Sequence, residues 1–164
     1  MTAETLVAKR AKGSFPAAGI GMGGDLKCAF GTYEIAAAVE TGDIFEMCKL
    51  PAGAVVVHGL IYGDDIDTGT EALDFDIGWK ATDDEVTDTD GFGNLGTITG
   101  DVITDLKPEV SIFYPFGGVL RTAGPKLFTA PATLQVYVNT ASNAGHVGTL
   151  TMVVFYVVDP NYVV

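Results

Sequence analysis

The feature that most constrains this chain is a strict alternation of apolar and acidic residues in LDFDIGW, residues 73–79. Large apolar side chains occupy the odd positions from Leu73 to Trp79, and Asp74 and Asp76 stand between them. Successive side chains of a β-strand point to opposite faces, so this pattern predicts a strand with one face in a core and the other in water.

Further segments with strand-like patterns follow one another along the chain, separated by Gly, Asp and Asn residues that favour turns. The expected strands are residues 32–40, 43–50, 54–61, 73–79, 95–104, 109–121, 133–139 and 148–158, and the sixth of these is expected to be interrupted near Pro115 and Gly117-Gly118. No segment after residue 30 shows a helical period over three turns, and residues 81–94 form a long polar connection. The sequence therefore predicts an all-β fold, specifically an antiparallel β-sandwich that forms an eight-stranded jelly roll.

The third expected strand follows Pro51 and Gly53 and is apolar throughout. Uninterrupted alternation predicts two faces for it, with Val55, Val57 and Ile61 on one and Ala54, Val56, His58 and Leu60 on the other.

The first 30 residues differ in composition from the rest, so we expect a flexible N-terminal arm at 1–30 and a single sandwich domain at 31–164. Three of the nine basic residues, Lys9, Arg10 and Lys12, lie in this arm. The arm has too few large apolar residues to build a core, and a partner commonly orders such segments.

The charge of the chain constrains its partners. The net charge is −12, and 13 of the 21 acidic residues lie between Asp64 and Asp105, where Lys80 is the only basic residue. Such a surface repels nucleic acid. The first residues contain no apolar signal segment, and the longest apolar run, 152–158, is too short to span a membrane, so we expect neither secretion nor a membrane partner.

No catalytic constellation is visible in the sequence. The two histidines, His58 and His146, do not form the HxH pair of jelly-roll metalloenzymes, and no serine lies in GxSxG. The two cysteines, Cys28 and Cys48, are expected to be free thiols. We therefore expect no catalytic residues and no cofactor, and predict that the protein is not an enzyme.

The best candidate for a metal site is the loop DTDGFGN at residues 88–94. Calcium prefers several oxygen ligands on a flexible loop, and Asp88, Asp90 and Asn94 would supply them. The alternative interpretation is a plain acidic turn that serves solubility.

The chain resembles head decoration, or cement, proteins of tailed bacteriophages. The resemblance covers about residues 29–158 and depends on LPAGA at 50–54, on LDFDIG at 73–78 and on the strand that begins GTLT at 148. It implies a jelly roll that binds the major capsid protein on the outside of the capsid shell, often as a trimer. A protein of this kind is made in the host cytoplasm and ends in the virion, and the family implies no catalytic residue. The three basic residues of the arm are expected to contact the capsid.

The last expected strand, residues 148–158, is apolar on both faces. One face is expected to lie in the core, and the other carries Val153, Phe155 and Val157. A neighbouring copy would cover this second face, together with Phe113 of the sixth expected strand. The sequence thus predicts a homo-oligomer, with a trimer favoured by the resemblance.

A second hypothesis, from another class, is a carbohydrate-binding jelly roll of a phage fibre or lectin type. Its binding residues would be the aromatic side chains of Tyr62, Phe92 and Tyr137 beside the acidic loops.

Overall fold

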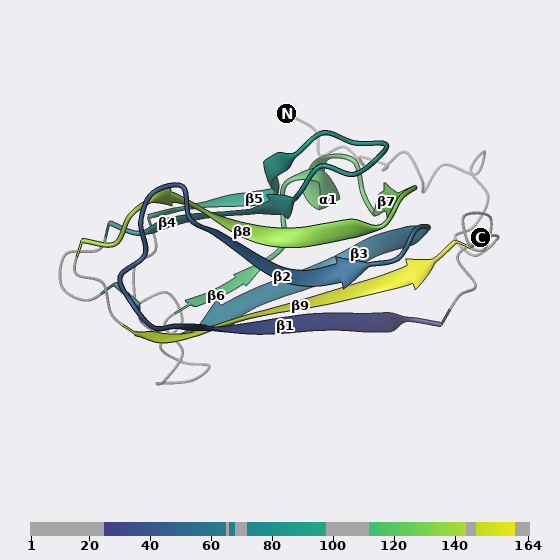
Figure 1. The fold of residues 1–164 in the computed structure, drawn as a ribbon. Helices are drawn as coiled ribbons and strands as arrows, with labels where there is room; N and C mark the ends of the chain where they lie inside the picture. The colour runs from purple at the N-terminus through teal and green to yellow at the C-terminus, as the bar shows by residue number, and fades with distance from the viewer. Residues whose placement is uncertain (1–24, 65, 68–71, 98–111, 144–146, 160–164) are drawn as a thin grey trace, which may run out of the picture.

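The computed structural model describes residues 25–64, 66–67, 72–97, 112–143 and 147–159. Within these residues the chain forms nine β-strands and one short helix. The strands build two antiparallel sheets that pack as two layers, with β5, β4 and β8 above and β3, β9 and β1 below in Figure 1. The predicted all-β sandwich of jelly-roll type is confirmed, with nine strands in the described residues rather than eight.

The five-stranded sheet has the order β1-β9-β3-β6, and β7 pairs with β3 on the same edge as β6. Its strands are β1 (Lys27–Ile35), β3 (Ala54–Gly63), β6 (Ile112–Pro115), β7 (Lys126–Phe128) and β9 (Gly148–Val158). The four-stranded sheet has the order β2-β8-β4-β5. Its strands are β2 (Ile44–Leu50), β4 (Asp74–Trp79), β5 (Asp88–Thr97) and β8 (Ala132–Thr140).

The core lies between the two sheets and contains the apolar face of β4 that the alternation predicted. Phe75 and Ile77 are completely buried, and Trp79 is nearly so. The ring of Trp79 makes edge contacts with Phe92 and Phe128 at centroid distances of 5.2 and 5.4 Å. These large apolar contacts supply the main favourable free energy of the fold.

A β-bulge in β3 makes the prediction of its two faces wrong. Val56 pairs with Tyr156 of β9, but the next paired residue of β3 is His58, so Val57 is an extra residue in the ladder. A bulge of this kind moves every later side chain to the opposite face. Val56 and Ile61, expected on different faces, are therefore both fully buried in the core.

Several expected boundaries also differ. The limit of the arm at residue 30 falls inside β1, which spans Lys27–Ile35 rather than 32–40. Strand β5 begins at Asp88 instead of residue 95, and residues 98–104 of the expected strand lie outside the described residues.

The interruption expected near Pro115 and Gly117-Gly118 is confirmed, since β6 ends at Pro115, but the segment after it is the short helix α1 (Val119–Thr122) rather than a continued strand. The break occurs at Gly118, which has φ = 50° and whose absent Cβ would lie 2.3 Å from the carbonyl oxygen of Gly91. Only glycine fits this approach without strain, so the strand ends before it.

Candidate functional site

The outer face of the five-stranded sheet carries the residues expected in an interface. Residues paired directly across an antiparallel ladder point to the same face. Three rows of side chains cross the strands on this outer face. These rows are Phe30, Val153, Leu60 and Pro115; Cys28, Phe155 and His58; and Val157, Val55 and Leu127. We call these three rows the apolar face.

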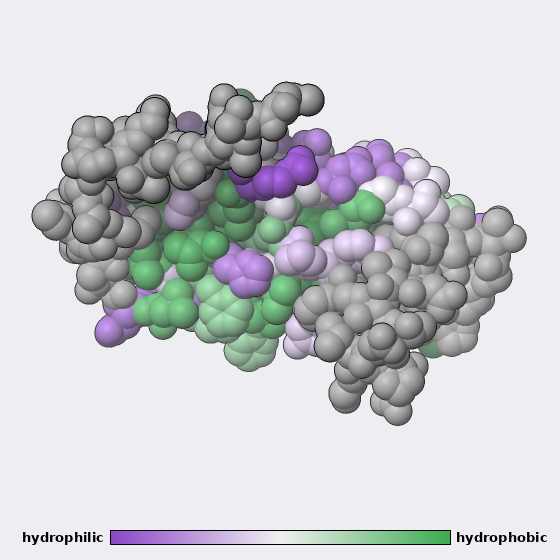
Figure 2. Space-filling view, turned by 180° about the vertical axis from the view of Figure 1, so that it is seen from behind, coloured by the Kyte–Doolittle hydropathy of each residue, from purple (hydrophilic) through white to green (hydrophobic). Residues whose placement is uncertain are grey.

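The apolar face is partly open to solvent. Phe30 is 72% exposed, while Val153, Phe155 and Val157 are half-buried by their neighbours. The imidazole of His58 is exposed and stacks on the ring of Phe155 at 6.2 Å and 10°. Figure 2, seen from behind, shows apolar residues gathered on one face of the molecule. The structure thus places the three predicted β9 residues together on an outward-facing surface.

Phe113, the fourth residue predicted for the interface, lies in β6, where its backbone pairs with Tyr62. The structure describes the backbone of Phe113 but not its side chain. Phe30 was missed by the sequence interpretation because it was assigned to the arm. No local signal marks it, because apolar and polar residues do not alternate in Lys27–Ile35 and the segment is a strand through its pairing with β9.

The other end of the same outer face is polar. The hydroxyls of Thr32 and Thr151 are 3.1 Å apart, and Thr149 donates its hydroxyl to Glu34 at 2.9 Å. Asp64 accepts a hydrogen bond from the backbone N–H of Thr149 at 2.7 Å. The outer face therefore changes from apolar to polar along the strands.

A cluster of carboxylates lies on the outer face of the four-stranded sheet. Asp76 is only 6% exposed although it points away from the core. Burial, followed by the nearby charges of Asp74 and Asp90, raises the pKa of Asp76 to about 6. One oxygen, Oδ1, of both Asp74 and Asp76 is buried without a hydrogen-bond partner. Burial, followed by a side-chain hydrogen bond that protonated Asp88 donates to Asp90, also raises the pKa of Asp88.

The metal candidates do not lie on a flexible loop, so that part of the interpretation is wrong. Asp88, Asp90 and Asn94 belong to β5, and the residue between them, Phe92, is fully buried against Trp79. Asn94 Oδ1 accepts a hydrogen bond from the N–H of Gly96. Among the described residues no three His, Cys, Asp or Glu side chains gather closely enough to hold a metal ion.

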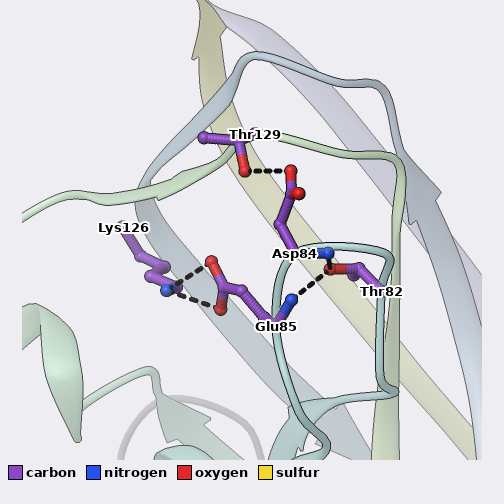
Figure 3. A network of polar contacts seen from close by, with 5 residues as sticks. All are labelled: Thr82, Asp84, Glu85, Lys126 and Thr129. Carbon is purple, nitrogen blue, oxygen red and sulfur yellow. Dashed lines mark hydrogen bonds and ion pairs between the residues drawn. The ribbon is translucent and has the colours of Figure 1, made fainter.

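Acidic residues of the connection before β5 fasten the two sheets together (Figure 3). Glu85 forms a half-buried ion pair with Lys126 of β7 at 2.7 Å, and Asp84 accepts a hydrogen bond from Thr129 at 2.6 Å. Thr82 Oγ1 accepts from the N–H of Glu85 at 3.0 Å. A Thr hydroxyl that accepts from a backbone N–H a few residues later commonly closes a turn of this kind.

One of the three aromatic residues expected to bind a glycan is not at the surface. Phe92, expected at the surface, is completely buried. Tyr62 and Tyr137 lie in different sheets, so they do not form a common platform.

His146 and the basic residues Lys9, Arg10 and Lys12 lie outside the described residues. In the part of the chain that is described, no helix has the length and apolar content needed to cross a bilayer.

No family model and no curated protein sequence matches this chain. Among solved structures, a two-sheet sandwich of this kind recurs in bacteriophage capsids. A chain in the capsid asymmetric unit of cyanophage Pam1 has 19% identity and a TM-score of 0.61, with 96% of this chain and 99% of that chain covered.

Two other phage capsids contain similar chains. One, in the capsid of Ralstonia phage GP4, has 20% identity and a TM-score of 0.60, covering 82% of this chain and 84% of that one. The other, in the acidic stable capsid of Helicobacter pylori bacteriophage KHP30, has 15% identity and a TM-score of 0.52, covering 80% and 87%. At these identities the likeness establishes the shared fold.

Proposed function

We propose that this protein is a structural component of a bacteriophage virion, which binds the outside of the capsid shell and stabilises it as a decoration protein. The observation that carries the proposal is the end-to-end match of this chain with a chain of the cyanophage Pam1 capsid, 96% of the first and 99% of the second. The sequence resemblance to decoration proteins at LPAGA and LDFDIG supports attachment to an existing shell.

The described part of the chain is consistent with a binding role rather than catalysis. Its two sheets enclose an apolar core, and the Thr82–Glu85 turn and the Glu85–Lys126 ion pair attach the connection before β5 to the five-stranded sheet. We therefore propose that the protein is not an enzyme, that its partners are the major capsid protein and further copies of itself, and that it resides on the virion after synthesis in the host cytoplasm. The resemblance favours a trimer.

The arm supplies the proposed contact with the capsid. Lys9, Arg10 and Lys12 are basic residues in a chain with a net charge of −12, so they would attach an otherwise repelling protein to acidic patches on the shell. Strand β1 begins at Lys27, and deletion of residues 1–24 therefore removes none of the described strands.

Co-sedimentation with emptied heads of the phage that encodes this protein tests the proposal. The full chain should sediment with the heads, and the chain lacking residues 1–24 should bind at least about tenfold more weakly with an almost unchanged melting temperature. A triple substitution of Lys9, Arg10 and Lys12 by Gln separates charge from length. Failure of the full chain to bind heads would refute the proposed function, and full binding by the truncated chain would refute the role of the arm.

A further inference from the structure

The apolar face of the five-stranded sheet departs from the usual surface of a β-sandwich. Outward side chains of a sandwich normally meet water and are polar, as they are at the Thr32 and Thr149 end of this same face. In the three apolar rows the only polar groups are the thiol of Cys28 and the imidazole of His58. Contiguous apolar surface of this kind generally marks an interaction site.

The size of the face suits association between proteins. Three rows across a sheet four strands wide cover roughly 400 Å² in projection, and the two polar rows beside them extend the face to roughly 650 Å². Each partner in a stable complex contributes about 800 Å² of accessible surface. An apolar centre with a polar margin is also the usual composition of an interface.

The distribution of charge indicates which partner fits. Copies of a protein with a net charge of −12 repel one another wherever their carboxylates meet. None of the residues in the three rows is an Asp or a Glu, so the carboxylates of Glu34 and Asp64 lie only at the polar margin and the centre of the contact brings no like charges together.

We propose that a second copy of this chain packs against the apolar face, with Phe30 and Phe155 as the aromatic anchors of the contact. Phe30 contributes most newly buried area because it is 72% exposed in the single chain. His58 lies beside Phe155 within the contact, where its stacked ring adds apolar area. This inference names the self-association surface of the proposed decoration protein, and it rests on that function only for its biological setting.

Phe30→Asp is the decisive substitution. The side chain is exposed, so the variant should keep the fold and its melting temperature, while association would bury a carboxylate without a partner. We expect light scattering at micromolar concentration to give a multiple of 17.1 kDa for the unmodified protein and 17.1 kDa for the variant. The dissociation constant should rise about 100-fold or more.

Val86→Asp is the matched control, because Val86 is 82% exposed, lies outside the apolar face and receives the same charge. It should associate like the unmodified protein. Phe155→Asp gives a second test from the centre of the face, and His58→Leu should leave association intact or tighten it. A 17.1 kDa mass for the unmodified protein, or an undiminished assembly for Phe30→Asp, overturns the proposal.

The outcome is separable from that of the proposed function, because association is measured without capsids. A protein that associates through this surface but does not bind phage heads would support the self-association surface and refute the decoration role. A monomer that binds phage heads would support the decoration role and refute the self-association surface.

Discussion

The outer faces of the two sheets depart from a normal water-facing surface in opposite ways. On the five-stranded sheet the outward position of Phe30 leaves a large aromatic ring 72% exposed. On the four-stranded sheet the outward position of Asp76 leaves a carboxylate only 6% exposed, and Gln135, paired with Gly78, is buried even more completely. Alternation along a strand therefore determines where a side chain points, while the surrounding residues determine whether it meets water.

The two departures have different energetic consequences. An exposed apolar side chain costs the isolated chain little but favours association with a partner. A buried carboxylate with an unpaired oxygen costs stability directly whenever it is ionised. The first therefore concerns assembly, and the second concerns the pH dependence of folding.

The largest expected effect comes from comparing two neighbouring residues on opposite faces of β9. Val154 is fully buried in the core, so Val154→Asp should cost more than about 4 kcal/mol or prevent folding. Val153 lies on the apolar face, and Val153→Asp should cost less than about 1.5 kcal/mol. Urea unfolding followed by Trp79 fluorescence measures both. Similar losses for the two variants would contradict the assignment of the faces.

Asp76 predicts a smaller effect that depends on pH. Its pKa is raised from 3.8 to about 6, so between these values the folded protein holds a proton that the unfolded chain has released. The contribution of this group to stability is therefore favourable at low pH and is lost as pH rises through about 4 to 6. Asp76→Asn should raise the free energy of unfolding by roughly 1–3 kcal/mol at pH 7.5 and change it little at pH 4.

Thermal unfolding at several pH values measures the effect of Asp76→Asn, and Asp83→Asn serves as control because Asp83 is exposed in the neighbouring connection. The control should leave the difference in stability between pH 4 and pH 7.5 unchanged. Equal gains for Asp76→Asn at both pH values would show that the carboxyl group does not bind its proton more tightly in the folded state.

The smallest expected effect concerns the fastening between the sheets. Lys126 pairs with Glu85 and lies 4.9 Å from the centre of the Trp79 ring, so removal of its charge affects both contacts. Lys126→Met should cost about 1 kcal/mol, since the pair is half-buried rather than fully exposed. A double-mutant cycle with Glu85→Gln should give a coupling of about 0.5–1 kcal/mol. A coupling of zero would mean that the ion pair contributes nothing to holding the connection.

Long, regular patterns in the sequence were sufficient for the fold class and for part of the apolar face. The alternation at 73–79 identified the core side of β4, and the run at 148–158 gave the bounds of β9. The position of Val153, Phe155 and Val157 followed from that run.

The remaining features depend on contacts between distant segments. The DTDGFGN segment looks like a loop because of its Gly and Asp content, yet Phe92 is held in the core by Trp79, Phe116 and Phe128. Strand β7 has only three residues, too few to show a period. Phe30 was assigned to the arm because pairing with β9, rather than local composition, makes Lys27–Ile35 a strand.

The extra residue in β3 has a consequence for how this protein can change during evolution. Val57 acts as a phase shift: before it the even-numbered residues face the core, and after it the odd-numbered ones do. If β3 instead paired regularly through Val57, its second half would turn over and bring His58 inward and Ile61 outward, whereas deletion of Val57 would remove the bulge and keep every later side chain on its present face. The core and the apolar face therefore depend together on the bulge, and deletion of Val57 is a change in strand length that leaves both faces in place.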